Sequence, residues 1–240
     1  MCDANKIMKM SETETHRIYS ICGIKLKFRK PNRIIVVDPD GTRKTVKRIK
    51  GLKVLFHKRN SEVVIHAPYN FEGCCFKLGL CSRIEILSTP HNIRGLQIFV
   101  KPRGEVTIGS NFSCNDSCRI LNTCEPNNRI MIGDDCMFAT DIYIRNNDGH
   151  TIIDRNSCKV INHPKDIIID NHVWLGYNVT VLKGAVIPDG CVIGARSVVS
   201  KPLTEPNAIY AGQPAKLIKS NIQWFREAIC KYLKLHPEGQ

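Results

Sequence analysis

The chain has 240 residues with 35 Lys or Arg against 22 Asp or Glu, which gives a net charge of +13. It contains no run of the roughly 18–20 apolar residues that a membrane-spanning helix needs. Residues 1–20 are polar and charged and lack the apolar region of a secretory signal. These features argue against a helical membrane protein and predict a cytoplasmic location.

Residues 1–60 form a basic extension, which we expect to fold as a β cap. Apolar runs at 34–37 and 54–56 predict short strands, and a Pro- and Gly-containing turn signal lies at 38–41. From residue 25 to 59, thirteen Lys or Arg face two Asp, a local charge of +11. This block favours a polyanionic partner, an acidic glycan or a membrane surface, and a solvated charged β-surface is the alternative. Nucleic acid is the weakest candidate, because no nucleic-acid motif accompanies the charge.

Residues 61–216 carry a period of six, which is strict from 169 to 199. Every sixth residue there is aliphatic, and the position four residues later is small or compact. The aliphatic series is Ile169, Leu175, Val181, Ile187, Ile193 and Val199; the small series is Val173, Val179, Ala185, Cys191 and Ser197. The same frame holds at Ile108, Cys114 and Ile120, breaks at 124–128, and resumes at Ile132, Phe138 and Ile144.

This period decides the fold class. A helix repeats near 3.6 residues and an ordinary strand at 2, whereas a hexapeptide period is typical of a parallel β-helix. Three six-residue sides make one triangular coil, and stacked coils align the inward aliphatics into one core. An irregular β-sandwich is the alternative. The open ends of such a solenoid are sheet edges, which need caps.

Four of the twelve cysteines fall in this frame. Cys136 and Cys191 occupy small inward positions, and Cys114 and Cys118 fit the aliphatic and small positions of an earlier coil. Because no pair of CxxC motifs has zinc spacing, we expect reduced, buried thiols that pack as small hydrophobes, and no metal site.

A loop is expected between Ile144 and Ile169. The two lie 25 positions apart, and one further coil takes about 18, which leaves about seven surplus residues. The segment begins with Arg145, Asn146, Asn147, Asp148, Gly149 and His150. Loops on a rigid scaffold commonly carry chemistry, so this one is the first candidate for the active site.

The chain ends in a predicted amphipathic helix within residues 217–240. From 221 to 233, Ile222, Phe225, Ile229, Tyr232 and Leu233 have helical spacing. We expect this helix to pack across the last coil and cover its edge.

The sequence resembles the hexapeptide-repeat acyltransferases, which have a left-handed parallel β-helix. The resemblance rests on the repeats at 175–200, NDGH at 147–150, HVWLG at 172–176 and AGQPAK at 211–216. The order NDGH then HVWLG most resembles bacterial capsule O-acetyltransferases, including those that act on polysialic acid. The resemblance implies the left-handed coil, a homotrimer, and acetyl-CoA as co-substrate in a groove between neighbouring subunits.

The resemblance also implies catalytic residues. His150 matches the family's catalytic histidine, and imidazole suits a general base because its pKa lies near neutrality. Asp148 either orients that imidazole or caps the turn. Trp174 matches the tryptophan beside the thioester, with a packed outer-face aromatic as the alternative, and His172 is the rival base. We expect direct attack in a ternary complex, because no cysteine or serine nucleophile stands in a suggestive setting.

The co-substrate would contact small residues and lysines near the end of the solenoid. Gly176 and Ala195 would offer backbone to the pantetheine arm, and Ala211 and Gly212 would line its far end. Lys201 and Lys216 would meet the phosphates, and Arg196 stands where relatives often have a small residue.

The expected function is acetyl-CoA-dependent O-acetylation of a bacterial surface glycan, such as a sialic acid-containing capsule or a lipopolysaccharide. One alternative is N-acetylation of a nucleotide-linked amino sugar or O-acetylation of a small metabolite. A non-enzymatic binding or scaffold module is another.

Overall fold

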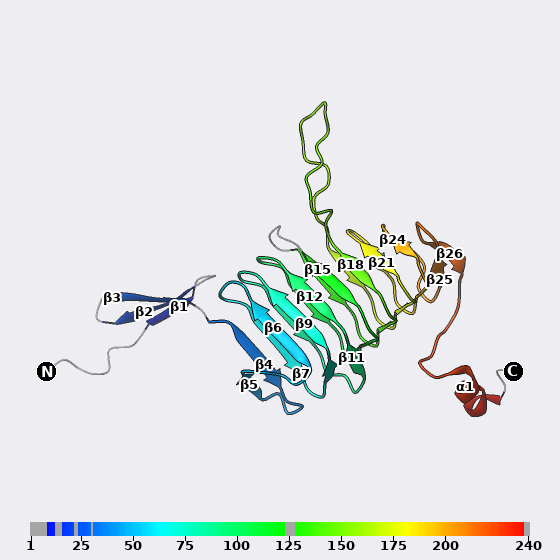
Figure 1. Ribbon diagram of the computed structural model, residues 1–240, viewed down its shortest axis with the longest axis horizontal. Helices are drawn as coiled ribbons and strands as arrows, with labels where there is room; N and C mark the ends of the chain where they lie inside the picture. The colour runs from blue at the N-terminus through cyan, green and yellow to red at the C-terminus, as the bar shows by residue number, and fades with distance from the viewer. Residues whose placement is uncertain (1–8, 13–15, 22–23, 30, 123–127, 238–240) are drawn as a thin grey trace.

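The computed structural model describes residues 9–12, 16–21, 24–29, 31–122 and 128–237. Its main body is a three-sided parallel β-helix (Figure 1), which confirms the predicted all-β solenoid. The expected interruption at 124–128 lies outside the described residues, except for Asn128. Within the described parts of the chain, no helix is long and apolar enough to cross a membrane.

Three parallel sheets form the sides of the solenoid, and the chain visits side one, side two and side three in turn. Side one contains β4 (Arg33–Val37), β7 (Glu62–His66), β10 (Arg83–Ile86), β13 (Glu105–Ile108), β16 (Arg129–Ile132), β19 (Ile167–Ile169) and β22 (Val186–Ile187), with β5 (Arg43–Val46) antiparallel beside β4. Side two contains β8 (Asn70–Glu72), β11 (Asn92–Arg94), β14 (Ser113–Cys114), β17 (Met137–Phe138), β20 (Trp174–Leu175), β23 (Val192–Ile193) and β25 (Ile209–Ala211), with β26 (Lys216–Lys219) antiparallel beside β25. Side three contains β6 (Leu52–Phe56), β9 (Cys74–Leu78), β12 (Gln97–Val100), β15 (Arg119–Asn122), β18 (Tyr143–Arg145), β21 (Thr180–Leu182) and β24 (Val198–Val199).

The core confirms the hexapeptide frame. Both predicted inward series, aliphatic and small, are buried, and their residues belong to one continuous cluster or its polar lining. Parallel pairing holds the register, so that Leu175 lies beside Phe138 on one side and Ile193 on the other. Cys114, Cys118, Cys136 and Cys191 are buried free thiols within this stack, as predicted. Burial raises the pKa of the Cys136 thiol to about 12, which keeps it protonated and unreactive.

The solenoid reaches further toward the N-terminus than the expected boundary at residue 61. The predicted strands at 34–37 and 54–56 are β4 and β6, and they pair in parallel with β7 and β9 of the next coil. Preceding them, β1 (Lys9–Glu12), β2 (His16–Ile21) and β3 (Ile24–Arg29) form a separate antiparallel sheet.

The loop after β18 is much longer than predicted. Ile144 on side three pairs with Val181, and Ile169 on side one pairs with Ile187. Val181 and Ile187 are six residues apart, so Ile144 and Ile169 occupy consecutive sides and no whole coil separates them. Nineteen of the 25 positions are therefore surplus, and the expectation of about seven was wrong. Residues 147–166, here called the arm, stand off the solenoid (Figure 1).

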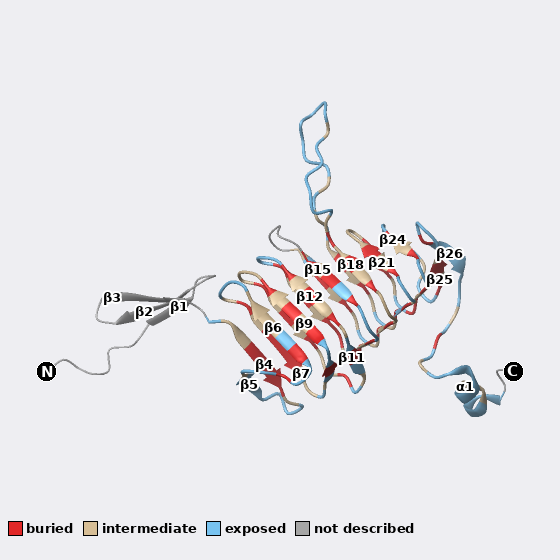
Figure 2. Cartoon of the chain, viewed as in Figure 1, coloured by how far each residue is buried: buried red, intermediate tan, exposed pale blue. Residues whose placement is uncertain are grey.

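The C-terminal helix is shorter than predicted and does not cover the last coil. It is α1 (Ile229–Leu235), and none of its residues is buried (Figure 2). Residues 221–228 are not helical. The edge of side two is continued instead by β26, which pairs with β25. Residues 220–226 lie between β26 and α1 and are here called the C-terminal strap. They run back over the corner between sides one and two.

Candidate functional site

The turn at residues 147–150 lies at the foot of the arm and is fixed by Arg145. The Arg145 Nε donates a hydrogen bond to Asn147 Oδ1 at 3.0 Å. Gly149 has φ of 86°, and a side chain there would collide with the Arg145 guanidinium. Glycine therefore allows both the left-handed backbone and the close approach of Arg145. Below the turn, the Lys165 N–H donates to the Asn146 carbonyl at 3.2 Å and closes the base of the arm.

Asp148 binds the arm to the solenoid. Its carboxylate accepts a hydrogen bond from Lys183, which follows β21, and another from Asn162 Nδ2 at 3.0 Å. The hydrogen bond from Lys183 is the main reason that the pKa of the Asp148 carboxyl lies below its ordinary value. Asp148 is thus engaged with the far strand of the arm, and this geometry favours the turn-holding interpretation over direct orientation of His150.

His150 is exposed on this turn. Its carbonyl accepts a hydrogen bond from Asn162 Nδ2 at 2.7 Å, which fixes the backbone. Among the described residues, none forms a hydrogen bond with its imidazole. Neither ring nitrogen is therefore occupied by the described part of the chain, so a lone pair can reach a substrate hydroxyl, as a general base requires.

Trp174 lies on β20, with its indole on the outer face of side two and 36% exposed. The arm projects from the solenoid between β18 on side three and β19 on side one. Trp174 and the turn of His150 thus belong to different parts of the triangular section. A single chain does not bring these two predicted site residues together.

Several residues predicted to contact the co-substrate follow side two in successive coils. Gly176, Gly194 and Ala211 are neighbours across coils, and a Cβ on Gly176 would lie 2.8 Å from the Ile193 carbonyl oxygen. Gly176 is therefore required for coil stacking, whatever else it contacts. Ala195 and Gly212 lie one residue further along and are exposed. The Gly212 N–H donates to Ser197 Oγ at 3.0 Å.

The predicted lysines lie at two different places. Lys216 begins β26 and is paired with Ala211, beside the row of small residues. Lys201 follows β24 on side three, on the way to side one, so it lies away from that row. Both side chains are exposed. Arg196 is also exposed, and its carbonyl accepts a hydrogen bond from Gln213 Nε2 at 2.7 Å.

His172 is not free to act as a base. Its Nδ1 lies 2.6 Å from Asp135 Oδ2, and its Nε2 lies 3.0 Å from the carbonyl oxygen of Trp224. Burial raises the pKa of the Asp135 carboxyl, but hydrogen bonds from His172 and Arg226 outweigh this and leave the pKa below its ordinary value. Asp135 is therefore ionised and accepts only. Both ring nitrogens of His172 thus lie within hydrogen-bond distance of acceptor atoms of the same chain, which leaves neither of them facing a substrate.

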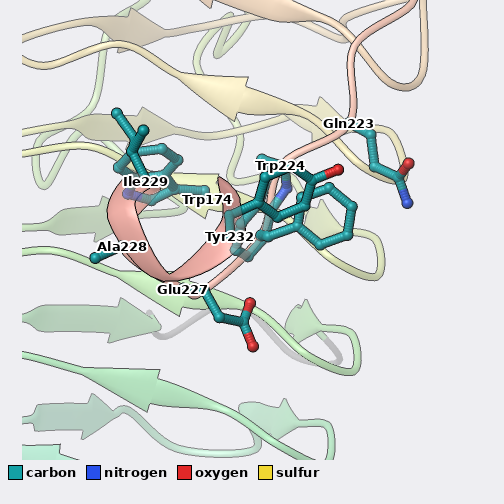
Figure 3. Close-up of a pocket in the computed structure, with 8 residues that line it drawn as sticks. Trp174, Gln223, Trp224, Glu227, Ala228, Ile229 and Tyr232 are labelled. Atoms are coloured by element: carbon teal, nitrogen blue, oxygen red, sulfur yellow. The ribbon is translucent and has the colours of Figure 1, made fainter. Parts of the chain in front are cut away.

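The C-terminal strap borders Trp174. Trp224 is 5% exposed and lies 5.9 Å from the Trp174 ring, centroid to centroid. A cavity of about 640 Å³ opens beside the two tryptophans. Trp174 and Trp224 line it together with Ile229 and Tyr232 of α1 (Figure 3). Glu227 supplies a carboxylate at its rim.

Sequence reasoning missed the residues that hold this site. Arg145, Asn162 and Lys183 fix the turn, but Lys183 and Asp148 are 35 positions apart. Trp224 was missed because it falls outside the helical spacing. A sequence signal existed nonetheless, since the chain has only two tryptophans and one follows the last repeat.

Comparison with known proteins gives several similar acetyltransferases, although no model of a protein family matches the chain. A polysialic acid O-acetyltransferase of Escherichia coli O1:K1 / APEC is 38% identical over 134 residues, which are 55% of this chain and 39% of that protein. One from Neisseria meningitidis is 50% identical over 99 residues, 41% of this chain and 46% of that protein. The chain thus spans less than half the length of these two relatives.

A solved structure extends the likeness over nearly the whole fold. The crystal structure of the polySia specific acetyltransferase NeuO superposes with a TM-score of 0.72 at 28% identity, covering 88% of this chain and 95% of that one. Together with the hexapeptide coils, NDGH and HVWLG, these comparisons show that the chain is similar in sequence and fold to hexapeptide-repeat acetyltransferases, the polysialic acid O-acetyltransferases among them.

Proposed function

We propose that this protein is an acetyl-CoA-dependent O-acetyltransferase that acetylates a hydroxyl of a bacterial surface glycan. One observation carries the proposal: the exposed imidazole of His150, with both nitrogens open, on a turn that Arg145 and Asp148 hold against a rigid solenoid. The named activities of the similar proteins support the same chemistry.

His150 acts as the general base in this proposal. Acetyl-CoA supplies the acetyl group as an activated thioester. His150 takes the proton of the acceptor hydroxyl as that oxygen attacks the thioester carbonyl, the C–S bond breaks, and the proton returns to the sulfur so that CoA leaves as its thiol. The acceptor and donor are bound together, so the protein itself is not acylated. A positioned base of this kind contributes roughly 10²–10⁴ in rate. The rival base His172 has no free nitrogen.

The complete site requires a second copy of the chain, and we propose a homotrimer. His150 and Trp174 are on different parts of one protomer, so a neighbouring subunit supplies the other half. The arm offers a contact for such a neighbour, because it exposes aliphatic side chains on both faces of its hairpin. These are Ile152, Ile153, Val160 and Ile161, each at least 40% exposed. Exposed apolar groups of this density mark interaction surfaces.

The donor lies along the corner that follows side two. The row of small residues there, with Ala195 and Gly212 exposed, leaves backbone accessible to the amides of a pantetheine arm. Lys216 stands beside this row and is suited to a phosphate. Lys201 lies elsewhere on the same chain, so it reaches the donor only across a subunit boundary.

The acceptor is an acidic glycan, and a polysialic acid polymer is the candidate. Arg43, Lys47, Arg48, Lys50 and Lys53 are exposed around β5 and β6. A cluster of positive charges attracts a polyanion and raises its local concentration, and salt weakens this effect by screening the charges.

An acceptor panel tests this proposal. Release of CoA thiol is followed with polysialic acid, a neutral polysaccharide, serine and a nucleotide-linked amino sugar, at low and high salt. The proposal predicts turnover with polysialic acid and an acceptor KM that rises with salt. Turnover with serine or the amino sugar alone would contradict the glycan assignment, and a KM independent of salt would contradict the role of the basic residues.

A further inference from the structure

The C-terminal strap spans five coils at the corner between sides one and two, and the hydrogen bonds described here reach four of them. The Ile222 N–H donates to the Asn207 carbonyl at 2.8 Å. Trp224 contacts the coil of His172, and Arg226 contacts the coils of Asp135 and Asn111. The strap therefore joins positions up to 115 residues apart in the sequence.

Trp224 is fixed on His172 by two kinds of contact. The rings are stacked with centroids 4.0 Å apart and planes 9° from parallel. The indole Nε1 donates to the His172 carbonyl at 2.9 Å, and His172 Nε2 donates to the Trp224 carbonyl at 3.0 Å. A stacked ring whose Nε1 is hydrogen-bonded, on a residue whose own carbonyl is also bound, has little freedom to turn, so the face that Trp224 presents to Trp174 is rigid.

Arg226 anchors the strap two residues further on. Its guanidinium donates to Asp135 Oδ1 at 2.8 Å, to Ser113 Oγ at 2.7 Å, and to the carbonyls of Asn111 and Cys136 at 2.9 and 3.1 Å. These are charge-assisted bonds from a planar donor, which fix position as well as supply energy. Asp135 joins both anchors, because its second oxygen binds His172.

We propose that the strap is a positioning element for Trp174, with Trp224 as the positioning residue and Arg226 as its anchor. Trp174 is only 36% exposed although it points outward, and Trp224 and Tyr232 share its cavity. The strap thus limits the orientations of the Trp174 indole, which lies on side two between the strap and the corner that the donor is proposed to follow. This inference rests on the proposed function in placing Trp174 beside the donor.

The two tryptophans make the inference measurable without an activity assay. Trp224→Phe keeps a ring on His172 and leaves Trp174 as the only tryptophan. In that background, Arg226→Gln should release the strap and raise acrylamide quenching of Trp174 by about twofold, since opening exposes an indole that is now mostly covered. Lys231→Gln removes the same charge from an exposed α1 position and serves as the control. Equal quenching in the two variants would overturn the inference.

Calorimetric titration with CoA supplies the functional readout. Arg226→Gln should weaken CoA binding roughly tenfold, in line with the loss of charge-assisted bonds, Arg226→Lys by less, and Lys231→Gln not at all. Asp135→Asn loosens the same anchor from the solenoid side and replaces Arg226→Gln if that variant does not fold. Unchanged CoA affinity in the anchor variants would overturn the inference. Wild-type protein that binds CoA in this way yet acetylates no acceptor would support the inference and overturn the proposed function.

Discussion

The solenoid and the arm differ in how they treat their aliphatic residues. In the solenoid, aliphatic side chains recur every six residues and are buried in one continuous stack. In the arm, Ile152, Ile153, Val160 and Ile161 are exposed (Figure 2). The first arrangement stabilises one chain by itself, whereas the second gains from burial only against another surface. The comparison teaches that stability resides in the coils, and that the arm is free to carry His150.

Loss of the His150 imidazole should have the largest effect on activity. His150→Asn is expected to lower kcat by roughly 10²–10⁴, since the carboxylate of the same turn, Asp148, is engaged by Lys183 and Asn162. Thermal unfolding should not change, because the side chain is exposed. His57→Asn alters another exposed histidine and is the control. A loss of less than tenfold in kcat would contradict the role of His150.

Truncation inside the solenoid should have the largest effect on stability. Ile193 is fully buried, so Ile193→Ala should reduce the free energy of unfolding by about 2–5 kcal/mol through lost transfer energy and a residual cavity. Ile153→Ala in the arm should change it by less than about 0.5 kcal/mol. Chemical denaturation of the purified proteins compares the two, and similar losses would contradict the division between coils and arm.

Polar substitution in the arm should instead act on assembly. Ile152→Ser with Ile161→Ser removes the larger part of one apolar face of the hairpin, so the proposed trimer should dissociate to smaller species in sedimentation equilibrium. The circular dichroism spectrum should remain that of the wild type. Ile218→Ser changes an exposed aliphatic residue of β26 outside the arm. Trimers that persist only in this control would confirm the arm as an interface, whereas trimers in all variants would contradict it.

The smallest effect is expected at Asp148. Its folded pKa is below the ordinary value, so its contribution is complete above the unfolded pKa, about 3.9, and disappears as the pH falls through the folded pKa. Asp148→Asn should therefore loosen the arm at neutral pH and have no effect in strong acid. The partly exposed ion pair between Asp148 and Lys183 contributes less than about 1 kcal/mol to stability. Hydrogen exchange of the arm amides measures this, and equal protection in wild type and variant at pH 7 would contradict it.

The difference between the regular solenoid and the arm also explains what could be predicted from the sequence. The rows of inward-facing side chains could be predicted because a period of six is a local pattern. The position of Val173 or Cys191 in the repeat follows from a few neighbouring residues. The length of the arm was not, since it depends on the side that Ile169 occupies, which pairing with Ile132 decides.

The C-terminal strap was harder still. The residues that hold Trp224 and Arg226 lie 52 to 115 positions away in the sequence. Helical spacing at 222, 225 and 229 predicted a helix from 221 onward, whereas residues 221–228 are not helical. In the structure Ile229 is 79% exposed, whereas Trp224, outside that spacing, is buried. Non-local hydrogen bonds prevailed over local periodicity. For the site, the motifs predicted His150 and Trp174 but not the residues that hold them.

The most direct test of the central claim is mass spectrometry of polysialic acid oligomers after incubation with acetyl-CoA and the protein. We expect products heavier by acetyl groups, which mild alkali removes as it does O-esters, and no such products with His150→Asn. Alkali-stable acetylation, or full product formation by His150→Asn, would contradict it.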